Sequence, residues 1–223
     1  MSNQQEVLKI LARELPDTGP TLNFKNTFEL LVAVILSAQC TDKQVNKTTA
    51  GLFARYQTPQ EFANLTPEQL AKEIKGCGLY RNKSLHIIKT CRILVEKYGG
   101  KVPDNLVELR SLPGVGRKTA NVVLNIAYQK PTFPVDTHVF RVARRLGLSS
   151  GNTILQVEKD LMKLIPEQER GNWHHRLIQF GRTICTSKKP QCHHCPVNKF
   201  CRQTGRNNNA SSAGGTGNTR QYR

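Results

Sequence analysis

Apolar residues recur every three or four positions along most of this chain. This spacing is that of amphipathic α-helices, and it limits the fold more than any other feature. Residues 28–36 are apolar on all sides, which predicts a helix at the centre of a core. No segment has the alternating pattern of a strand or hairpin. The sequence therefore predicts an all-α protein, with helices near residues 7–15, 28–36, 45–56, 85–94, 117–129, 137–146, 153–164 and 167–185.

Cap residues support several of these helix boundaries. The string Thr66-Pro67-Glu68-Gln69 predicts a helix start, with Thr66 as N-cap, proline in the first turn and Gln69 completing a capping box. Gly99 and Gly100 are expected to end the helix before them, and Asp104 is predicted to cap the next one.

The chain is strongly basic, with 33 Lys and Arg against 16 Asp and Glu and a formal net charge of +17. The 54 residues after Glu169 contain ten Lys or Arg and no acid. Such a balance favours a polyanionic partner, and at this level nucleic acid, an anionic membrane and an acidic protein all remain open.

Neither a membrane span nor a secretory signal is expected. The longest uninterrupted apolar run, Leu30–Leu36, has seven residues, whereas a span needs about 20. The N-terminal string MSNQQEVLKI lacks a basic start followed by an apolar stretch. We therefore expect no membrane association and a location in the cytosol or nucleoid.

The string Leu112-Pro-Gly-Val-Gly-Arg-Lys-Thr-Ala120 lies between two predicted helices. Glycines at 114 and 116 allow positive φ and close backbone approach, and a helix N-terminus follows at once. Gly114, Val115 and Gly116 can therefore seat a backbone phosphate without reading sequence. The alternative is an ordinary glycine-containing connection, but the whole string resembles a helix-hairpin-helix, a module associated with DNA binding.

Lys118 stands just inside the helix that follows. A nucleophilic amine must be unprotonated, and a helix N-terminus, a neighbouring cation and burial all favour the neutral form. Lys118 is therefore a candidate Schiff-base nucleophile, against the alternative of a phosphate-binding or solvated lysine. Asp136, in Phe133-Pro-Val-Asp-Thr-His138, is predicted to cap a helix. Its carboxylate could also stabilise positive charge on a sugar or help activate the amine.

Four of the seven cysteines form the pattern Cys185-x6-Cys192-x2-Cys195-x5-Cys201. Four thiolates in one short loop predict a metal centre. Because only one short Cys-x2-Cys step is present, a [4Fe–4S] cluster is favoured over zinc. Lys188 and Lys189 lie in the first gap and would face a phosphate backbone. The other three cysteines, Cys40, Cys77 and Cys91, are interpreted as small buried apolar residues.

Together, LPGVGRKTA, FPVDTHV and the cysteine spacing closely resemble the endonuclease III family of helix-hairpin-helix DNA glycosylases. The resemblance covers about residues 1–203. It implies a six-helix barrel domain at 21–130 that carries the helix-hairpin-helix, and a discontinuous iron–sulfur domain at 1–20 and 131–203. The DNA cleft would lie between these domains. Residues 204–223 are predicted to be a disordered basic tail, either a tether for nucleic acid or a dispensable extension.

The resemblance also implies a function: a monomeric glycosylase and abasic-site lyase acting on oxidised or saturated pyrimidines in duplex DNA. Lys118 would attack the sugar C1′ and Asp136 would assist. By similarity Gln39 fills the space of a flipped base and Leu79 wedges into the stack. Asp42 lies near the pocket, and His138 lines it or its phosphate rim. Asp42 could instead cap a helix, and Leu79 could be ordinary packing.

Two other functions stay open. An adenine- or thymine-mismatch glycosylase of the same fold is one, although such enzymes are expected to lack a lysine at position 118. A non-catalytic helix-hairpin-helix protein with a structural metal is the other, and it would share every binding motif. Lys118 and Asp136 are the residues that distinguish catalysis from binding alone.

Overall fold

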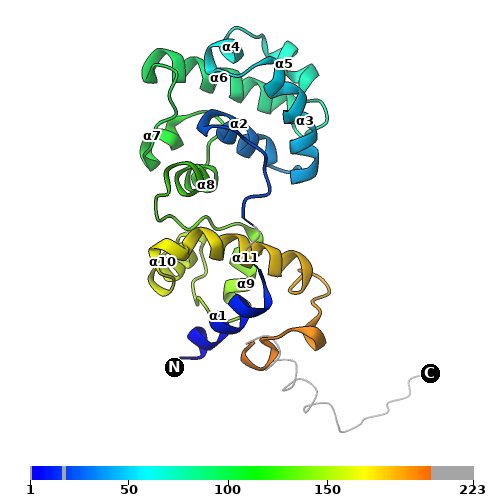
Figure 1. The fold of residues 1–223 in the computed structure, drawn as a ribbon, viewed down its shortest axis with the longest axis vertical. Coiled ribbons are helices and arrows are strands. Elements are labelled where there is room, and N and C mark those ends of the chain that lie inside the picture. Colours follow the sequence, from blue (N-terminus) through cyan, green and yellow to red (C-terminus); the bar gives the residue numbers. More distant parts are fainter. Residues whose placement is uncertain (1, 17–18, 202–223) are drawn as a thin grey trace, which may run out of the picture. The chain divides into compact units, whose positions relative to one another are not determined.

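The computed structural model describes residues 2–16 and 19–201, and every regular element within them is a helix (Figure 1). The all-α prediction is therefore confirmed for the described residues, whereas the predicted tail at 204–223 lies outside them. The α-helices are α1 (Asn3–Glu14), α2 (Thr27–Ser37), α3 (Asp42–Arg55), α4 (Pro59–Ala63), α5 (Pro67–Glu73), α6 (Tyr80–Tyr98), α7 (Leu106–Ser111), α8 (Arg117–Tyr128), α9 (Thr137–Arg145), α10 (Ile154–Leu164) and α11 (Arg170–Thr183). Three short 3₁₀ turns are η1 (Glu167–Glu169), η2 (Cys192–His194) and η3 (Asn198–Phe200).

The chain divides into two compact units, each made of separated segments. Unit 1 comprises Met1–Asp17, Val135–Ile165 and Trp173–Arg223. Unit 2 comprises Thr18–Pro134 and Pro166–Asn172. Helices α2 to α8 thus belong to unit 2, and α1, α9, α10 and most of α11 belong to unit 1.

Helix α2 is the centre of unit 2, as its all-round apolar sequence predicts. Every residue from Phe28 to Leu36 is buried, and the helix packs against α3, α6 and α8 (Figure 1). Helices α4 and α5 pack on α6. Full burial of one leucine or valine side chain contributes about 1.5–3 kcal/mol, so this single helix supplies a large share of the unit's apolar stabilisation.

Unit 1 joins the N-terminal helix to the C-terminal half of the chain through specific hydrogen bonds. The Gln4 Nε2 donates to the carbonyl oxygen of Gly147 over 2.9 Å. The Arg176 Nε donates to the carbonyl oxygen of Leu15, also over 2.9 Å. Val7 and Leu11 on α1 are fully buried. The first helix is therefore part of a core made otherwise from residues after 134.

The predicted helix cap is confirmed at Thr66 and wrong at Asp104. The Thr66 hydroxyl oxygen accepts from the Gln69 backbone N–H, and the Gln69 side-chain oxygen accepts from the Thr66 backbone N–H. These two bonds form the expected capping box. The cap of α7, in contrast, is Asn105, whose Oδ1 accepts from the Glu108 N–H over 2.9 Å. The prediction that Asp104 caps this helix is wrong, because its carboxylate accepts from Lys130 Nζ over 3.0 Å instead.

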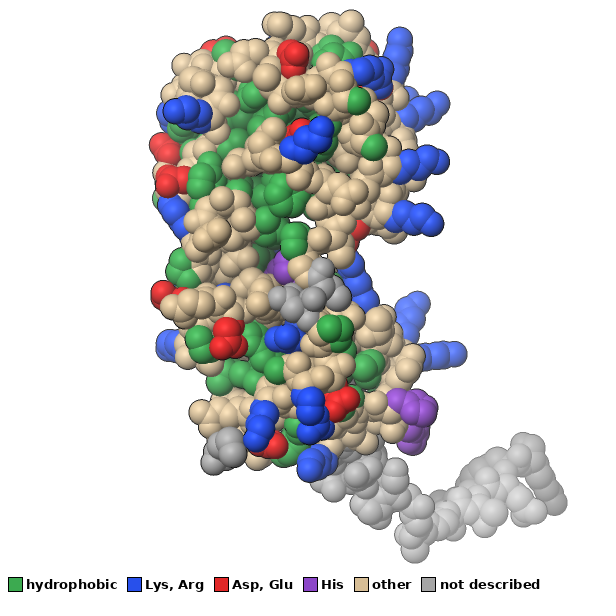
Figure 2. Space-filling view, viewed as in Figure 1, with side chains coloured by type: hydrophobic (Ala, Val, Ile, Leu, Met, Phe, Trp, Pro, Cys, Tyr) green, Lys and Arg blue, Asp and Glu red, His purple; other side chains and the backbone are tan. Residues whose placement is uncertain are grey.

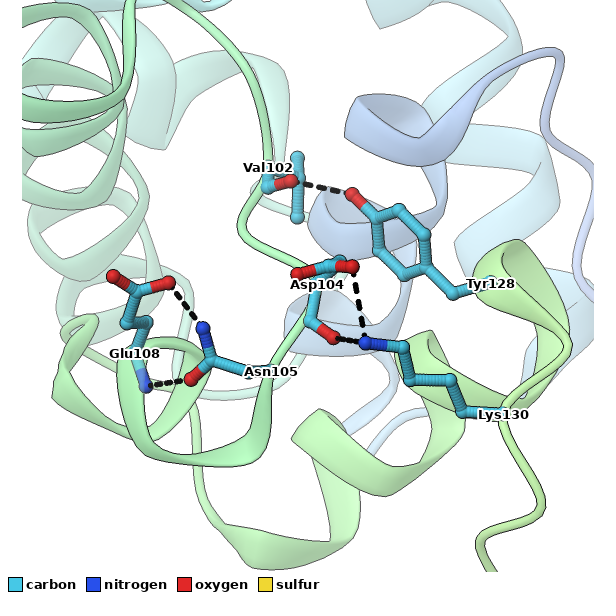
Figure 3. A network of polar contacts seen from close by, with 6 residues as sticks. All are labelled: Val102, Asp104, Asn105, Glu108, Tyr128 and Lys130. Carbon is cyan, nitrogen blue, oxygen red and sulfur yellow. Dashed lines mark hydrogen bonds and ion pairs between the residues drawn. The ribbon is translucent and has the colours of Figure 1, made fainter.

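Figure 3 shows how this bond helps to close the hairpin of α7 and α8. Lys130, just after α8, donates to the carboxylate and to the carbonyl oxygen of Asp104, just before α7. The Tyr128 hydroxyl donates to the Val102 carbonyl oxygen. Both contacts join the segment entering the hairpin to the segment leaving it, so the two helices are fixed at their open ends as well as at their turn.

Among the described residues, no helix combines the length and the apolar character that crossing a membrane requires.

Candidate functional site

The turn between α7 and α8 treats its two glycines differently. Gly114 has φ of +77°, and a Cβ placed there would lie 3.0 Å from the Cβ of His86. Gly116 has φ of −81°, and a Cβ there would meet nothing within 4 Å. Gly114 is therefore needed by the fold, whereas the open space at Gly116 is the surface that a phosphate can approach.

Val115 stabilises this turn by packing its side chain into the core and by a backbone hydrogen bond. Its side chain is buried, and its N–H donates to the Leu112 carbonyl oxygen over 3.1 Å. Gly116 is the N-cap of α8 and supplies no side-chain cap. The positive end of the α8 dipole is therefore not covered by a capping side chain at Gly116, and it favours an anion at this position.

Lys118 is the second residue of α8 and its side chain is exposed. Lys118 is therefore not buried within unit 2. An exposed amine at the start of the helix is also in a position to reach a bound substrate.

Asp136 caps α9, as predicted. Its Oδ1 accepts from the backbone N–H groups of His138 and Val139 over 2.9 and 2.8 Å. His138 is half-buried in the first turn, and its Nδ1 lies 3.2 Å from Nη2 of Arg141. Asp136 and His138 belong to unit 1, whereas Lys118 belongs to unit 2.

Gln39 and Leu79, predicted to enter the DNA stack, share an uncommon backbone conformation. Both lie in the left-handed region, with φ of +52° and +57°. Their loops adjoin, because a Cβ at Gly78 would lie 2.9 Å from the Gln39 carbonyl oxygen. The Leu79 side chain is 54% exposed. A left-handed non-glycine residue is strained and is often found at functional sites, and an exposed leucine is available for insertion.

Asp42 is the first residue of α3 but does not cap it. Thr41 is the N-cap and accepts from the Gln44 N–H. The Asp42 carboxylate accepts from the Thr21 hydroxyl over 2.7 Å. The alternative reading of Asp42 as a helix cap is therefore wrong, and its half-buried carboxylate lies three residues from Gln39.

Lys83 is a residue of this region that the sequence reading missed. Its side chain is 5% exposed, and its Nζ donates to the carbonyl oxygens of Leu36 and Ala38 over 2.7 and 2.6 Å. Burial lowers the pKa of this amine. Lys83 therefore joins α6 to the end of α2, directly before Gln39. Its spacing of four from the buried Ile87 is the signal that would have revealed it.

The four cysteines of the predicted metal loop line one cavity in unit 1, which confirms that the spacing brings them together. Cys185 is buried, and the other three are half-buried. Within the described residues, no group of three or more His, Cys, Asp or Glu side chains is arranged to hold a single metal ion. His193 and His194 are exposed and are not among the residues lining the cavity.

The thiol chemistry of this cavity fits an iron–sulfur cluster. Burial, followed by the nearby charges of the other three cysteines, raises the pKa of the Cys195 thiol. A thiolate at Cys195 is therefore favoured when a positively charged centre is bound beside it. A [4Fe–4S] cluster takes one thiolate on each iron, so four thiols spaced around a cavity suit it.

Two arginines on α9 hold the cysteine loop. Arg141 donates through Nε and Nη2 to the Cys185 carbonyl oxygen over 3.1 and 3.0 Å. Arg145 donates to Thr186 over 2.8 Å and lies 3.5 Å from the Cys185 sulfur. Their i, i+4 spacing was visible in the sequence, but their partners lie some 40 residues away and were not. The loop is thus attached to α9 besides any bond to metal.

Lys188 and Lys189 are exposed on the loop that the cysteines enclose. In unit 2, Lys and Arg side chains also project from the edge where α3 and α5 lie, on the right of Figure 2. Each unit therefore presents cations to a polyanion.

Comparison with known proteins agrees with the fold and with both motif regions. Residues 32–167 match the family model of the HhH-GPD superfamily of base excision DNA repair proteins. Residues 185–201 match the model of the iron–sulfur binding domain of endonuclease III. The chain is therefore an HhH-GPD base excision repair protein with an iron–sulfur domain.

Individual relatives identify the family within this superfamily more closely. The chain is 47% identical to endonuclease III of Escherichia coli strain K12, over 88% of this chain and 93% of the relative. It is 49% identical to endonuclease III of Bacillus subtilis strain 168, over 84% and 86% of the two chains. A solved endonuclease III in a trapped covalent intermediate with DNA matches with a TM-score of 0.86 and 47% identity, covering 93% of this chain and 99% of the other.

The chain belongs to the endonuclease III family. It is accordingly a DNA glycosylase and lyase of base excision repair, it binds DNA, and it carries a [4Fe–4S] cluster.

Proposed function

We propose that the chain removes oxidised or saturated pyrimidines from duplex DNA and then cuts the strand on the 3′ side of the abasic site. The observation that carries this proposal is the placement of Lys118, an exposed amine in the first turn of α8, directly after the open phosphate seat at Gly116. A phosphate held at that seat brings the neighbouring sugar within reach of the amine.

In the proposed reaction the neutral Lys118 Nζ attacks C1′ of the damaged nucleotide while the bond to the base breaks. The base leaves with the bonding electron pair and takes up a proton. The bound nitrogen then loses a proton, and the C1′–O4′ bond of the sugar ring breaks as O4′ takes up a proton, which leaves a protonated Schiff base between Nζ and C1′. This Schiff base acidifies the C2′ hydrogen, and loss of that proton expels the 3′ phosphate. Asp136 would stabilise the positive charge that develops on the sugar, an electrostatic role that suits its ionised form.

The nucleotide must leave the stack before this attack, because C1′ is poorly accessible in an intact duplex. We assign the vacated space to Gln39, the wedge to Leu79, and the pocket or its rim to Asp42 and His138. The left-handed backbone of Gln39 and Leu79 and their adjoining loops support this assignment. The two units would act as a barrel domain and a cluster domain of one monomeric enzyme, with DNA held by both.

Cys185, Cys192, Cys195 and Cys201 would hold the cluster, whose chemistry here is to fix the loop as a rigid, cation-bearing surface. Lys188 and Lys189 would then contact phosphates through charge alone. The mismatch-glycosylase alternative is not favoured, since a solved thymine-DNA glycosylase shares the fold at only 23% identity. The non-catalytic alternative is not favoured either, since the chain belongs to the endonuclease III family.

Borohydride trapping tests the role of Lys118. Wild-type protein incubated with an abasic-site duplex and borohydride is expected to form a covalent adduct. Lys118→Gln is expected to form none, because an amide cannot make a Schiff base. Lys163→Gln, which removes an exposed lysine from α10 in unit 1, is the control and should trap as wild type does. Full trapping by Lys118→Gln would overturn the assignment.

A further inference from the structure

We propose that Cys40 and Cys77 are a redox-active thiol pair. Their oxidation to a disulfide by a low-molecular-weight disulfide would cross-link the Gln39 loop to the Leu79 loop and weaken binding to damaged DNA. The two cysteines lie in unit 2, far from the iron–sulfur loop in sequence, and the reaction proposed above makes no use of them.

The two thiols lie in the same region of the core although 37 positions separate them, because Cys40 packs against the buried cluster that contains Cys77. Each thiol is close enough to act on the charge of Lys83, and the Cys77 Sγ donates to the Thr48 hydroxyl oxygen over 3.7 Å. Their backbones approach closely beside Gly78, where an added Cβ would lie only 2.9 Å from the Gln39 carbonyl oxygen. Lys83 fixes the other side of the same loop through Ala38.

The two thiols differ in a way that orders the reaction. Cys40 is half-buried and reachable from solvent, whereas Cys77 is 1% exposed. Burial raises the pKa of the Cys77 thiol by more than the nearby Lys83 lowers it, so Cys77 is the less reactive thiol of the two. Cys40 is therefore the attacking thiol and Cys77 the resolving one.

The balanced reaction has two exchanges. The Cys40 thiolate attacks one sulfur of the external disulfide, forms a mixed disulfide and releases one thiolate. The Cys77 sulfur then attacks the Cys40 sulfur and gives its proton to solvent, while the second external thiolate leaves. Two protein thiols lose two electrons in total, and one external disulfide becomes two thiols.

The bond has consequences for DNA binding because of the neighbours of each cysteine. Gln39 precedes Cys40, and Leu79 follows Cys77 by two residues. A disulfide requires the sulfurs to approach to about 2.05 Å, closer than any unbonded contact, so the two loops must shift. The two loops already approach closely at Gly78, where an added Cβ would lie 2.9 Å from the Gln39 carbonyl oxygen, so a shift of one loop acts on the other. We therefore expect Gln39 and Leu79 to be displaced from the positions that insertion requires.

The test uses the full-length, cluster-loaded protein and oxidised glutathione as the disulfide. Peptide mapping without reductant is expected to find a cross-link between the peptides carrying Cys40 and Cys77. Lesion-duplex affinity is expected to fall about tenfold or more, since a misplacement near 1 Å costs ~100-fold in well-positioned sites. Dithiothreitol should restore it. The visible absorbance of the cluster, followed in the same samples, shows that the iron–sulfur thiolates are intact.

Cys40→Ala and Cys77→Ala should each bind DNA equally well before and after oxidation, each compared with its own reduced form. Cys91→Ala is the matched control, because Cys91 is fully buried elsewhere in the same core and its loss should leave the cross-link and its effect unchanged. If one alanine variant fails to fold, the other still decides the matter.

Three results would overturn the inference: no Cys40–Cys77 peptide in wild type, a stable glutathione adduct on Cys40 without the cross-link, or a complete cross-link with unchanged DNA affinity. The mapping involves no DNA, so its outcome is independent of the lesion class and of the Schiff-base chemistry proposed above.

Discussion

At the scale of a single side chain, Asp136 has an observed role as a helix cap and a proposed role in catalysis, and two substitutions separate them. As a cap it needs only an acceptor for the His138 and Val139 amides, which asparagine also provides. As an electrostatic partner of a charged sugar it needs the negative charge. We expect Asp136→Asn to keep its stability within about 0.5 kcal/mol and to lose about 100-fold in single-turnover rate.

Asp136→Ala should lose the same rate and, in addition, about 1 kcal/mol of unfolding free energy through the missing cap. Urea unfolding and single-turnover cleavage of an abasic duplex measure the two quantities. A wild-type rate in Asp136→Asn would reduce this residue to a helix cap.

Cys91 makes the stability of the fold depend on alkaline pH. Burial raises the pKa of this thiol from 9.0 to about 12. Between these values the unfolded chain releases the proton and the folded chain keeps it. The unfolded state then binds fewer protons, so the unfolding free energy falls as pH rises, by at most about 1.4 kcal/mol per pH unit.

Cys91→Ala removes this titration. Its stability relative to wild type should therefore improve as pH rises from 9.0 towards about 12, although the cavity lowers it at neutral pH. Urea unfolding of both proteins over that range tests the sign. Parallel pH curves for the two proteins would contradict the burial of an ionisable thiol.

At the scale of elements, we expect substitutions of the two glycines in the α7–α8 turn to affect different properties, stability for Gly114 and DNA binding for Gly116. Gly114→Ala places a Cβ in the left-handed region and against His86, so we expect a loss of about 1–2 kcal/mol in unfolding free energy. Gly116→Ala meets no atom within 4 Å and should change stability much less. Its added methyl group occupies the phosphate seat, however, and should weaken DNA binding.

Thermal unfolding and duplex binding of both variants give the comparison. If Gly116→Ala binds DNA as well as wild type, the phosphate lies elsewhere. If Gly114→Ala is as stable as wild type, the turn does not depend on its positive φ.

Sequence predicts those features of this fold that are encoded within a few residues. The capping box at Thr66, the cap at Asp136 and the core helix 28–36 follow from local patterns. The prediction of Asp104 as the cap of α7 is wrong because Asp and Asn are both good caps. Only the contact of Asp104 with Lys130 distinguishes it from Asn105, the observed cap. The cysteine loop could be predicted because its four cysteines are close together in the sequence.

Other features depend on contacts between distant segments and leave no local signal. The left-handed backbone of Gln39 is one, because the residue carries no glycine-like preference for it. The choice of hydrogen-bond partners by Lys83 is another, since the carbonyl oxygens of Leu36 and Ala38 lie 45 or more positions away in the sequence. The exposure of Lys118 likewise had to be observed. Catalytic geometry is therefore the part of the site that sequence predicts least.

At the scale of the whole molecule, the net charge of +17 is distributed over both units, and this distribution predicts how salt acts. Each phosphate neutralised by Lys or Arg releases condensed counterions, so the logarithm of DNA affinity should fall linearly with the logarithm of salt concentration. In the proposed mechanism the chemical step occurs at a single lysine inside an assembled complex. Its single-turnover rate at saturating protein should change far less than the affinity does.

Lys188→Gln combined with Lys189→Gln measures the share of the cysteine loop in this effect. If both side chains contact phosphates, the magnitude of the salt slope should fall by about 2, since each contact contributes roughly 0.9. The cluster and the lyase rate at saturation should be unaffected, because neither lysine lines the cysteine cavity. An unchanged slope would place the DNA away from this loop. A fall in the saturated rate equal to the fall in affinity would mean that the loop also positions the reacting sugar.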